Sequence, residues 1–278
     1  MIGSNSVTKF VSLRHFAAQR TILRSLALST SARDLYVDLL VRSIVDGIYG
    51  EPMAGPWRVG NKFDRGERSP GRLGPTTAHT MVGVDRLQNL RDLVQTALDE
   101  HVPGDFIETG VWRGGCCILM RGMLAANGDR GRKVYVADSF SGVPPPNPQQ
   151  YPADSDSDLH KHLELAVPLD VVKANFDRYG LLDDQVVFVE GLFSETLPTL
   201  KCDSFALIRL DGDLYESTAV ALEYLHPKVS PGGFIIIDDF GVIPACRQAV
   251  FDYRARHKID SPIYKVDRSG VWWRKPSS

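Results

Sequence analysis

Four aspartates follow two apolar segments of this 278-residue chain, and their arrangement suggests a cation site. Asp211 and Asp213 follow the apolar residues of "LIRLDGDLYEST", and Asp238 and Asp239 follow those of "GGFIIIDDF". If the two segments are neighbouring strands of one sheet, four carboxylates meet at one rim, where they repel unless they share protons or bind a cation. An all-oxygen ligand set favours Mg²⁺, with Mn²⁺ or Ca²⁺ as alternatives. The competing interpretation is that these aspartates are helix N-caps and solvated turn residues, because Asp is common in turns.

A second acidic position lies in "FIETGVWRGG", residues 106–115, where an apolar segment runs into a glycine-rich turn. Small residues there allow a ligand to approach the backbone closely at a helix N-terminus. The turn is not the dinucleotide fingerprint, because the glycine after Gly110 comes four residues later and G-x-G-x-x-G fails. Asp138 lies thirty residues after Glu108, where an acidic side chain can accept both ribose hydroxyls of a nucleoside. A ribose site without a pyrophosphate cradle suggests S-adenosylmethionine, and the alternative is that Glu108 and Asp138 only cap helices.

The two sites together predict methyl transfer to an oxygen atom. A hydroxyl is a poor nucleophile until its proton is removed or its oxygen is bound to a metal. Mg²⁺ held by Asp211, Asp238 and Asp239 could chelate two vicinal oxygens of an acceptor and lower the pKa of one of them. Asp213 is the candidate general base, a role worth about 10² to 10⁴ in rate. In-line positioning of oxygen, methyl and sulfur would supply the rest of the acceleration.

These residues need a sheet that brings strand ends together, and the hydrophobic pattern predicts one. Segments that are apolar nearly throughout, as in strands buried on both faces, occur at 106–111, 134–137, 186–189, 205–210 and 234–237. Helices are expected at 34–49, 84–100, 116–126, 169–179 and 217–225. "PIYKVD" and "VWWRK", joined by "RSG", predict an antiparallel hairpin at one edge. The expected fold class is therefore α/β, with an open, mainly parallel sheet of seven strands.

Composition argues against several other classes of protein. The chain has 32 Lys and Arg against 34 Asp and Glu, a formal net charge of −2, so no global field attracts nucleic acid or an anionic membrane. No apolar run approaches the roughly 20 residues that span a bilayer. The four cysteines have neither the spacing of a zinc site nor the density of a disulfide framework, which fits a reducing cytoplasm: Cys116, Cys117, Cys202 and Cys246.

We expect one domain, residues 34–278, behind an N-terminal extension. Residues 1–33 contain five Lys or Arg and no Asp or Glu. This composition is compatible with a flexible or loosely docked extension, and also with a transit peptide or a basic amphipathic helix. The stretches near 50–77 and 144–162 are expected to be long loops that act as lids, with disorder as the alternative for the first.

The order of several motifs resembles that of the macrocin O-methyltransferase family, metal-dependent enzymes that methylate deoxysugar hydroxyls on macrolide and aminocoumarin antibiotics. The motifs run from about residue 35 to 274 and include "AHTMVGVDRLQNL", "GDFIETGVWRGG", "VADSF", "RYGLLDDQV", "LDGDLYEST", "SPGGFIIIDDF" and "IPACRQAV". The resemblance implies a Rossmann-like class I methyltransferase that uses S-adenosylmethionine and Mg²⁺. It also implies a homodimer whose N-terminal helices reach the neighbouring active site. Asp211, Asp238 and Asp239 fall on the family's metal site, and Asp213 falls on its proposed base.

The candidate cofactor contacts combine these motifs with the turns at the strand ends. The resemblance places "HTM", residues 79–81, at the contact to the methionine part of the cofactor, and "VEGLF", residues 189–193, is expected beside the adenine. The candidates are Thr80, Met81, Glu108, Thr109, Gly110, Val111, Arg113, Gly114, Gly115, Asp138, Ser139, Gly191 and Phe193.

The acceptor is less well defined than the cofactor. Residues 144–162 correspond to the family's substrate-closing segment, which varies among members with different acceptors. His160 and Tyr215 are the candidate acceptor contacts, although a solvated surface residue explains His160 equally well. The D-x-D-x-D run at 154–158 is not an EF-hand loop, because Leu159 and Leu165 stand where that loop needs glycine and glutamate.

Several functions are compatible with these features. A deoxysugar hydroxyl of a glycosylated natural product is the expected acceptor, and a catechol-type phenol, which also offers two adjacent oxygens, is the alternative. The failed glycine fingerprint argues against a nicotinamide-dependent dehydrogenase. A non-catalytic nucleoside-binding protein would have little use for Asp213 beside a metal triad.

Overall fold

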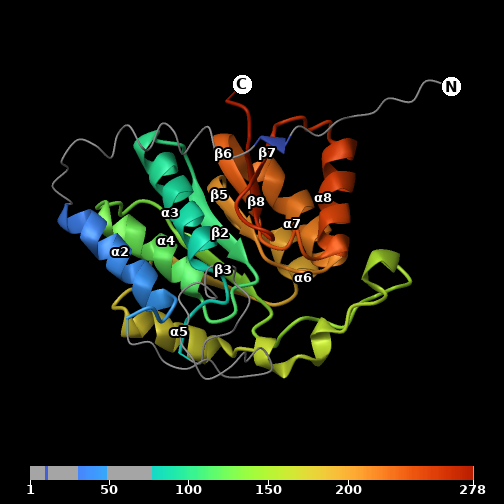
Figure 1. The fold of residues 1–278 in the computed structure, drawn as a ribbon, viewed down its shortest axis with the longest axis horizontal. Helices are drawn as coiled ribbons and strands as arrows, with labels where there is room; N and C mark the ends of the chain where they lie inside the picture. Colours follow the sequence, from blue (N-terminus) through green and yellow to red (C-terminus); the bar gives the residue numbers. More distant parts are fainter. Residues whose placement is uncertain (1–9, 12–30, 49–76, 278) are drawn as a thin grey trace.

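The structure is a computed structural model that describes residues 10–11, 31–48 and 77–277. Most of the expected N-terminal extension and nearly all of the expected loop at 50–77 lie outside the described residues. The described chain forms one sheet with helices on both faces (Figure 1).

The sheet has eight strands in the order β1-β7-β8-β6-β5-β2-β3-β4. Strands β2 to β6 pair in parallel, whereas β8 pairs antiparallel with both β6 and β7. The seven predicted strands and the C-terminal hairpin are therefore confirmed. The short strand β1 adds to the edge by pairing in parallel with β7, and the hydrophobic pattern did not predict it. The strand bounds are β1 Phe10–Val11, β2 Asp105–Thr109, β3 Val134–Asp138, β4 Val186–Glu190, β5 Phe205–Leu210, β6 Val229–Ile237, β7 Ile263–Lys265 and β8 Val271–Arg274.

The register of the central strands brings the polar strand ends to one rim. Thr109 at the end of β2 lies between Ala137 of β3 and Leu210 of β5, and Leu210 in turn lies opposite Ile237 of β6. The residues that follow these positions are therefore neighbours across the sheet. The chain leaves β2 toward β3 on one side and returns as β5 on the other, which makes this rim the topological switch point where open α/β sheets bind ligands.

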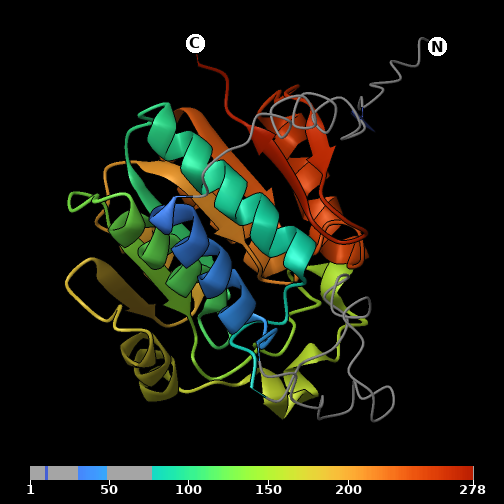
Figure 2. The same ribbon diagram turned by 60° about the vertical axis from the view of Figure 1, so that its left-hand side comes forward.

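Two hydrophobic cores hold the helices against the sheet. Helices α2, α3, α4 and α5 cover one face, and α6, α7 and α8 cover the other (Figures 1 and 2). Strand β5 is buried throughout: its Leu207 belongs to the first core, whereas Phe205 and Ile208 belong to the second. This burial on both faces explains the continuous apolar pattern of the strand. The helix bounds are α2 Ala32–Ile44, α3 Val84–Asp99, α4 Gly115–Ala126, α5 Leu169–Arg178, α6 Phe193–Thr196, α7 Tyr215–Leu225 and α8 Pro244–Arg256.

The predicted elements differ from the observed ones mainly at their ends. The first helix ends at Ile44 rather than near residue 49. Strand β2 ends at Thr109, two residues before the predicted end, because Gly110 turns the chain with a φ of 82°. A Cβ on Gly110 would lie 1.8 Å from the backbone oxygen of Asp211, so a side chain cannot be accommodated there.

Helix α8 was not among the predicted elements. Its first residue is a proline, which suits the first position of a helix because its missing N–H has no partner there anyway. Its buried residues recur at helical spacing but include a small Ala249 and a charged Arg254, so the apolar stripe in the sequence is weak. None of the helices in the described part of the chain combines the length and the apolar character that a bilayer crossing requires.

Candidate active site

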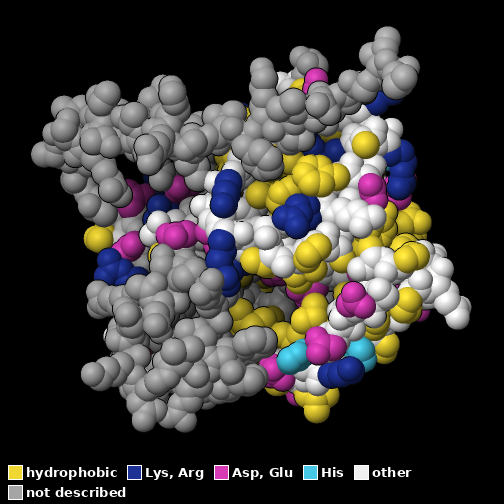
Figure 3. All heavy atoms as spheres, turned by 45° about the vertical axis from the view of Figure 1, so that its right-hand side comes forward, with side chains coloured by type: hydrophobic (Ala, Val, Ile, Leu, Met, Phe, Trp, Pro, Cys, Tyr) yellow, Lys and Arg dark blue, Asp and Glu magenta, His cyan; other side chains and the backbone are white. Residues whose placement is uncertain are grey.

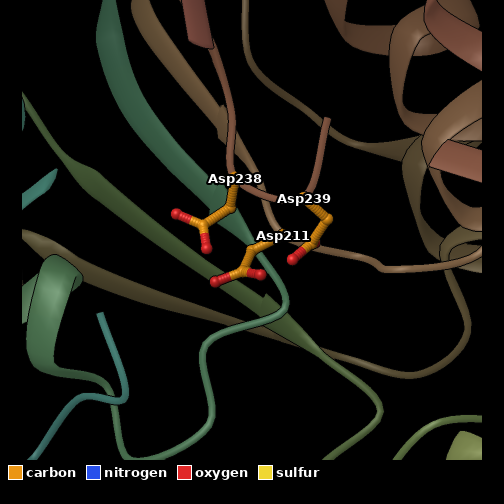
Figure 4. A group of neighbouring side chains, drawn as sticks. All are labelled: Asp211, Asp238 and Asp239. Atoms are coloured by element: carbon orange, nitrogen blue, oxygen red, sulfur yellow. The ribbon is translucent and has the colours of Figure 1, made fainter. Parts of the chain in front are cut away.

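The four predicted aspartates lie at the rim formed by the ends of β5 and β6. Asp211 and Asp238 directly follow the paired residues Leu210 and Ile237, so the register of the two strands places them side by side. Asp211, Asp238 and Asp239 each offer an oxygen, and these oxygens lie within 4.8 Å of one another (Figure 4). The structure thus brings together the three residues that the sequence assigned to a metal.

A buried arginine lies beneath these carboxylates. Arg209, only 2 % exposed, donates to Asp211 Oδ2 at 2.8 Å and also forms ion pairs with Asp238 and with Glu108. Arg209 pairs with Oδ1 of Asp238, whereas Arg86 pairs with its Oδ2 and also with Asp267 at 3.2 Å. The sequence analysis missed both arginines. A charged residue inside the apolar segment "LIRLD" is the signal that could have identified Arg209, because arginine is rarely buried without a partner.

Asp239 lacks the partners that Asp211 and Asp238 have. It is 8 % exposed, and its Oδ2 is buried without a hydrogen-bond partner among the described residues. Burial, followed by the charges of Asp213, Asp211 and Asp238, raises the pKa of Asp239 well above its usual range. A buried carboxylate oxygen without a donor is costly unless it is protonated or binds a cation.

The side chain of Asp213 also makes no hydrogen bond or ion pair with any residue that the structure describes, and its backbone conformation is unusual. Its φ of 60° is in the left-handed region that few non-glycine residues adopt. Burial and the neighbouring Asp211 and Asp238 raise the pKa of Asp213 to about 8. Strained backbone of this kind is found at active sites, where the surrounding structure holds it in place.

Two adjoining cavities open at this rim. The first, of about 270 Å³, extends from Asp211 and Asp213 toward Asp138 and Phe193. The second, of about 280 Å³, contains Asp238 and Asp239 in its wall. Both cavities are lined by Met81, Trp112, Leu165, Asp211 and Asp213. The carboxylates of Asp211 and Asp213 thus lie where a ligand in one cavity would meet a ligand in the other.

Six of the predicted cofactor contacts line the first cavity. Asp138 is fixed in its wall, because its two oxygens accept the backbone N–H groups of Val111 at 2.7 Å and Phe140 at 2.8 Å. Oδ1 also accepts the Ser139 hydroxyl at 3.4 Å, so Oδ2 is the oxygen that retains a lone pair for a ribose hydroxyl. The six residues are Met81, Gly110, Asp138, Ser139, Gly191 and Phe193.

The other predicted cofactor contacts are placed differently. Thr80, Glu108 and Val111 line the second cavity, and the oxygens of Glu108 face Arg209 and the thiol of Cys117, whose Sγ lies 2.9 Å from Oε2. Burial raises the pKa of Glu108 to about 7. Four candidates line neither cavity: Thr109, Arg113, Gly114 and Gly115.

Two of these four support the segment at 78–81 instead. Arg113 Nη1 donates to the backbone oxygen of Ala78 at 2.9 Å, and the N–H of Gly115 donates to that of His79 at 2.8 Å. The turn after β2 therefore holds the segment that brings Thr80 and Met81 to the cavities.

The two predicted acceptor contacts line neither cavity. Tyr215 begins helix α7, and its hydroxyl donates to Asp252 at 3.0 Å, away from the rim. His160 is half-buried, and its Nδ1 has no hydrogen-bond partner among the described residues. The same loop lines the second cavity with Leu159 and Leu165.

Comparison with known proteins agrees with this architecture. Residues 33–275 match the family described as macrocin O-methyltransferase (TylF). The chain is 51% identical over 248 residues, 89% of this chain and 95% of the relative, to the 8-demethyl-8-(2,3-dimethoxy-alpha-L-rhamnosyl)-tetracenomycin-C 4'-O-methyltransferase of Streptomyces olivaceus. It is 46% identical over 246 residues, 87% of this chain and 96% of the relative, to the mycinamicin III 3''-O-methyltransferase of Micromonospora griseorubida. The solved structure of the O-methyltransferase NovP superposes with a TM-score of 0.84 at 44% identity, covering 88% of this chain and 99% of that one.

The chain therefore belongs to the macrocin O-methyltransferase family and is an S-adenosylmethionine-dependent O-methyltransferase. The sequence-based recognition of the family and of the enzyme class is confirmed.

Proposed function

We propose that this member of the macrocin O-methyltransferase family methylates a deoxysugar hydroxyl of a glycosylated natural product in antibiotic biosynthesis. The names of the two relatives, one acting on a rhamnosyl tetracenomycin and one on mycinamicin III, support this class of acceptor. The observation that carries the proposal is the sharing of Asp211 and Asp213 by two cavities. A cofactor in the first cavity and an acceptor in the second would meet beside a carboxylate that can take a proton.

The first cavity suits S-adenosylmethionine. Asp138, held by two backbone donors, would accept a ribose hydroxyl, and Gly191 and Phe193 would flank the adenine. The methionine part would extend toward Met81 and Asp211, where the first cavity meets the second. This placement directs the methyl group at the acceptor side.

The residues at the rim fit a divalent cation held by Asp211, Asp238 and Asp239. The partnerless buried oxygen of Asp239 and the raised pKa of this residue indicate negative charge that the protein does not compensate. Arg209 pairs with Glu108, Asp211 and Asp238, and Arg86 pairs with Asp238, but neither guanidinium group pairs with Asp213 or Asp239. Mg²⁺ bound there would orient the acceptor oxygens and lower the pKa of the reacting hydroxyl.

Asp213 is the residue we assign to proton removal. It lines both cavities and makes no side-chain hydrogen bond or ion pair with any residue that the structure describes, so its carboxylate can face the acceptor. A raised pKa brings it close to the operating pH, where a general base is most effective. Deprotonation of the hydroxyl by Asp213 and attack on the methyl group would leave S-adenosylhomocysteine and the methyl ether.

The test begins with binding. Titration calorimetry with S-adenosylmethionine and with NAD, each in Mg²⁺ and in EDTA, is followed by a methyl-transfer screen over deoxysugar glycosides and catechols. We expect binding of S-adenosylmethionine only, and turnover of glycosides that requires Mg²⁺. Failure to bind S-adenosylmethionine would overturn the cofactor assignment. Turnover of catechols alone would overturn the sugar acceptor, and full turnover in EDTA would overturn the metal site.

A further inference from the structure

The loop between β3 and α5, residues 139–168, forms part of the wall of both cavities. It contains three short 3-10 turns, η1 Pro152–Asp154, η2 Leu159–Lys161 and η3 Leu163–Leu165. Pro144 and Asn147 line the first cavity, Leu159 lines the second, and Leu165 lines both. The position of this loop therefore affects both ligands.

One aspartate of this loop is buried, unlike its neighbours. Asp154 is 1 % exposed, whereas Ser155, Asp156 and Asp158 are exposed. Acidic, basic and histidine side chains lie together in the lower part of Figure 3, in keeping with the polar sequence of 155–162. A buried carboxylate needs hydrogen-bond donors to offset its lost hydration.

Asp154 finds these donors on helix α7. Its Oδ1 accepts the backbone N–H of Tyr215 at 2.6 Å, and its Oδ2 accepts that of Glu216 at 3.0 Å. The rings of Tyr151 and Tyr215, with centroids 6.0 Å apart, add a second contact between the loop and the helix. The loop is thus bound to the first turn of α7.

Helix α7 has no cap of its own. Its N-cap residue, Leu214, has no side chain that can accept a hydrogen bond, and the first N–H groups of a helix lack partners within it. Asp154 supplies the missing acceptor from 61 residues earlier in the chain, and its negative charge stands at the positive end of the helix dipole.

The capped turn lies next to the proposed base. Asp213 is two residues before Tyr215, and its left-handed backbone is held between Gly212 and Leu214, whose N–H donates to the Gly212 oxygen at 2.6 Å. Residues in this backbone region stay there only when the structure around them holds them. Fixing the start of α7 therefore fixes the place of Asp213.

We infer that Asp154 is a positioning residue that couples two events at the site. When the loop at 139–168 covers the cavities, the Asp154 carboxylate caps α7 and holds Asp213 in its working position. When the loop opens, the cap is lost and Asp213 is released. The part of this inference that concerns turnover rests on the proposed function, whereas the contact between loop and helix does not.

The test compares three variants in the D-x-D-x-D run. Asp154→Ala removes both acceptors, Asp154→Asn keeps one, and Asp156→Ala is the matched control at an exposed aspartate of the same run. Hydrogen exchange of the Tyr215 and Glu216 amides is measured without cofactor or acceptor. The kcat and the KM for the acceptor are measured in Mg²⁺.

We expect exchange of the two amides to become at least about tenfold faster in Asp154→Ala, to an intermediate degree in Asp154→Asn, and not at all in Asp156→Ala. The value of kcat/KM should fall in the same order, by about 10- to 100-fold in Asp154→Ala, because misplacing a reacting group is costly. Both kcat and KM should change, since the base and the loop are both released.

Three results would overturn the inference: unchanged exchange at Tyr215 and Glu216, equal effects in Asp156→Ala, or faster exchange with kcat and KM unchanged. The last would reduce Asp154 to a structural cap. If the wild-type enzyme methylated no acceptor, the proposed function would fail, and the exchange rates would still decide whether the loop caps the helix. The Asp154→Asn variant keeps the test decisive if Asp154→Ala does not fold.

Discussion

The two halves of the rim differ in the hydrogen-bond donors that they offer to their acidic side chains. At the end of β3, Asp138 has both oxygens bonded to backbone N–H groups, which offset part of the rise in pKa that burial causes. At the end of β6, Asp239 has a buried oxygen without a donor, and Asp213 beyond β5 has a pKa raised to about 8. In the first half, each oxygen of the buried carboxylate therefore has a hydrogen-bond donor. In the second half, Arg209 and Arg86 pair with Asp211 and Asp238 but with neither Asp213 nor Asp239.

This difference corresponds to what each half would bind under the proposed function. A ribose is neutral and needs only well-placed acceptors, which fixed backbone donors can orient in advance. A divalent cation needs several negative oxygens close together, and these repel until it arrives. We therefore read the completeness of one half and the imbalance of the other as features of a nucleoside site and a metal site.

The largest expected effect comes from Asp213 in the unbalanced half. Asp213→Asn keeps the size of the side chain but removes the base, so we expect kcat to fall by about 10² to 10⁴ while the affinity for S-adenosylmethionine is unchanged. Steady-state kinetics and calorimetry measure the two quantities, with Asp177→Asn on the exposed face of α5 as control. An Asp213→Asn enzyme with wild-type kcat would refute the assignment of the base.

The next effect concerns Arg209, which connects the two halves through Glu108 and Asp238. Arg209→Met would leave these buried carboxylates without their cation, and we expect the free energy of unfolding to fall by about 3 to 5 kcal/mol. Urea titration measures this change. Arg256→Met, which breaks an exposed ion pair with Glu223, should cost less than about 1 kcal/mol. An equal loss of unfolding free energy in the two variants would show that Arg209 does not compensate the charge of the buried carboxylates.

A smaller effect should appear in how stability depends on pH without metal. The pKa of Asp213 is about 8 in the folded protein against an ordinary value of 3.8, so between these values the folded state holds a proton that the unfolded state has lost. This contribution to stability is present below about pH 4 and is lost as the pH rises toward 8. Asp213→Asn should remove that loss and be more stable than wild type by roughly 1 to 3 kcal/mol at pH 8 in EDTA.

Urea titrations of both proteins from pH 5 to pH 8 check this expectation. Glu108, whose pKa is about 7, titrates in both proteins, so the difference between them reports Asp213 together with the rise that its charge causes in the pKa of Asp239. Parallel pH profiles would contradict the idea that the metal-free rim is overcharged. Added Mg²⁺ should stabilise the wild type, because a ligand that binds only the folded state shifts the equilibrium toward it.

The smallest expected effect lies in the balanced half. Asp138→Ala removes the acceptor for the ribose, and we expect the Kd for S-adenosylmethionine to rise about tenfold, the range of a hydrogen bond to a charged group. The affinity for Mn²⁺, measured by calorimetry, should not change. A matching loss of Mn²⁺ affinity would mean that the two halves do not act separately.

The strands and their ends could be predicted from the sequence because burial on both faces makes each central strand apolar throughout, and Asp211, Asp238 and Asp138 directly follow such segments. Arg209 was missed because it occupies one position of an otherwise apolar strand, and its partners come from two other strands. The burial of Asp154 could not be read from a run in which every second residue is Asp, since only the fold brings it to α7. The start of α7 at Tyr215 depends on the same contact.

The close approach of Gly110 to the backbone oxygen of Asp211 bears on how new acceptor ranges can be engineered. The turn after β2 and the rim after β5 touch there with no space for even one more carbon atom. In a random library, any substitution of Gly110 would disrupt the turn after β2 and the carboxylates after β5 at the same time. The walls made by Leu159 and Leu165 come from a surface loop, which tolerates sequence change far better. Directed evolution should therefore vary the loop and leave Gly110 unchanged.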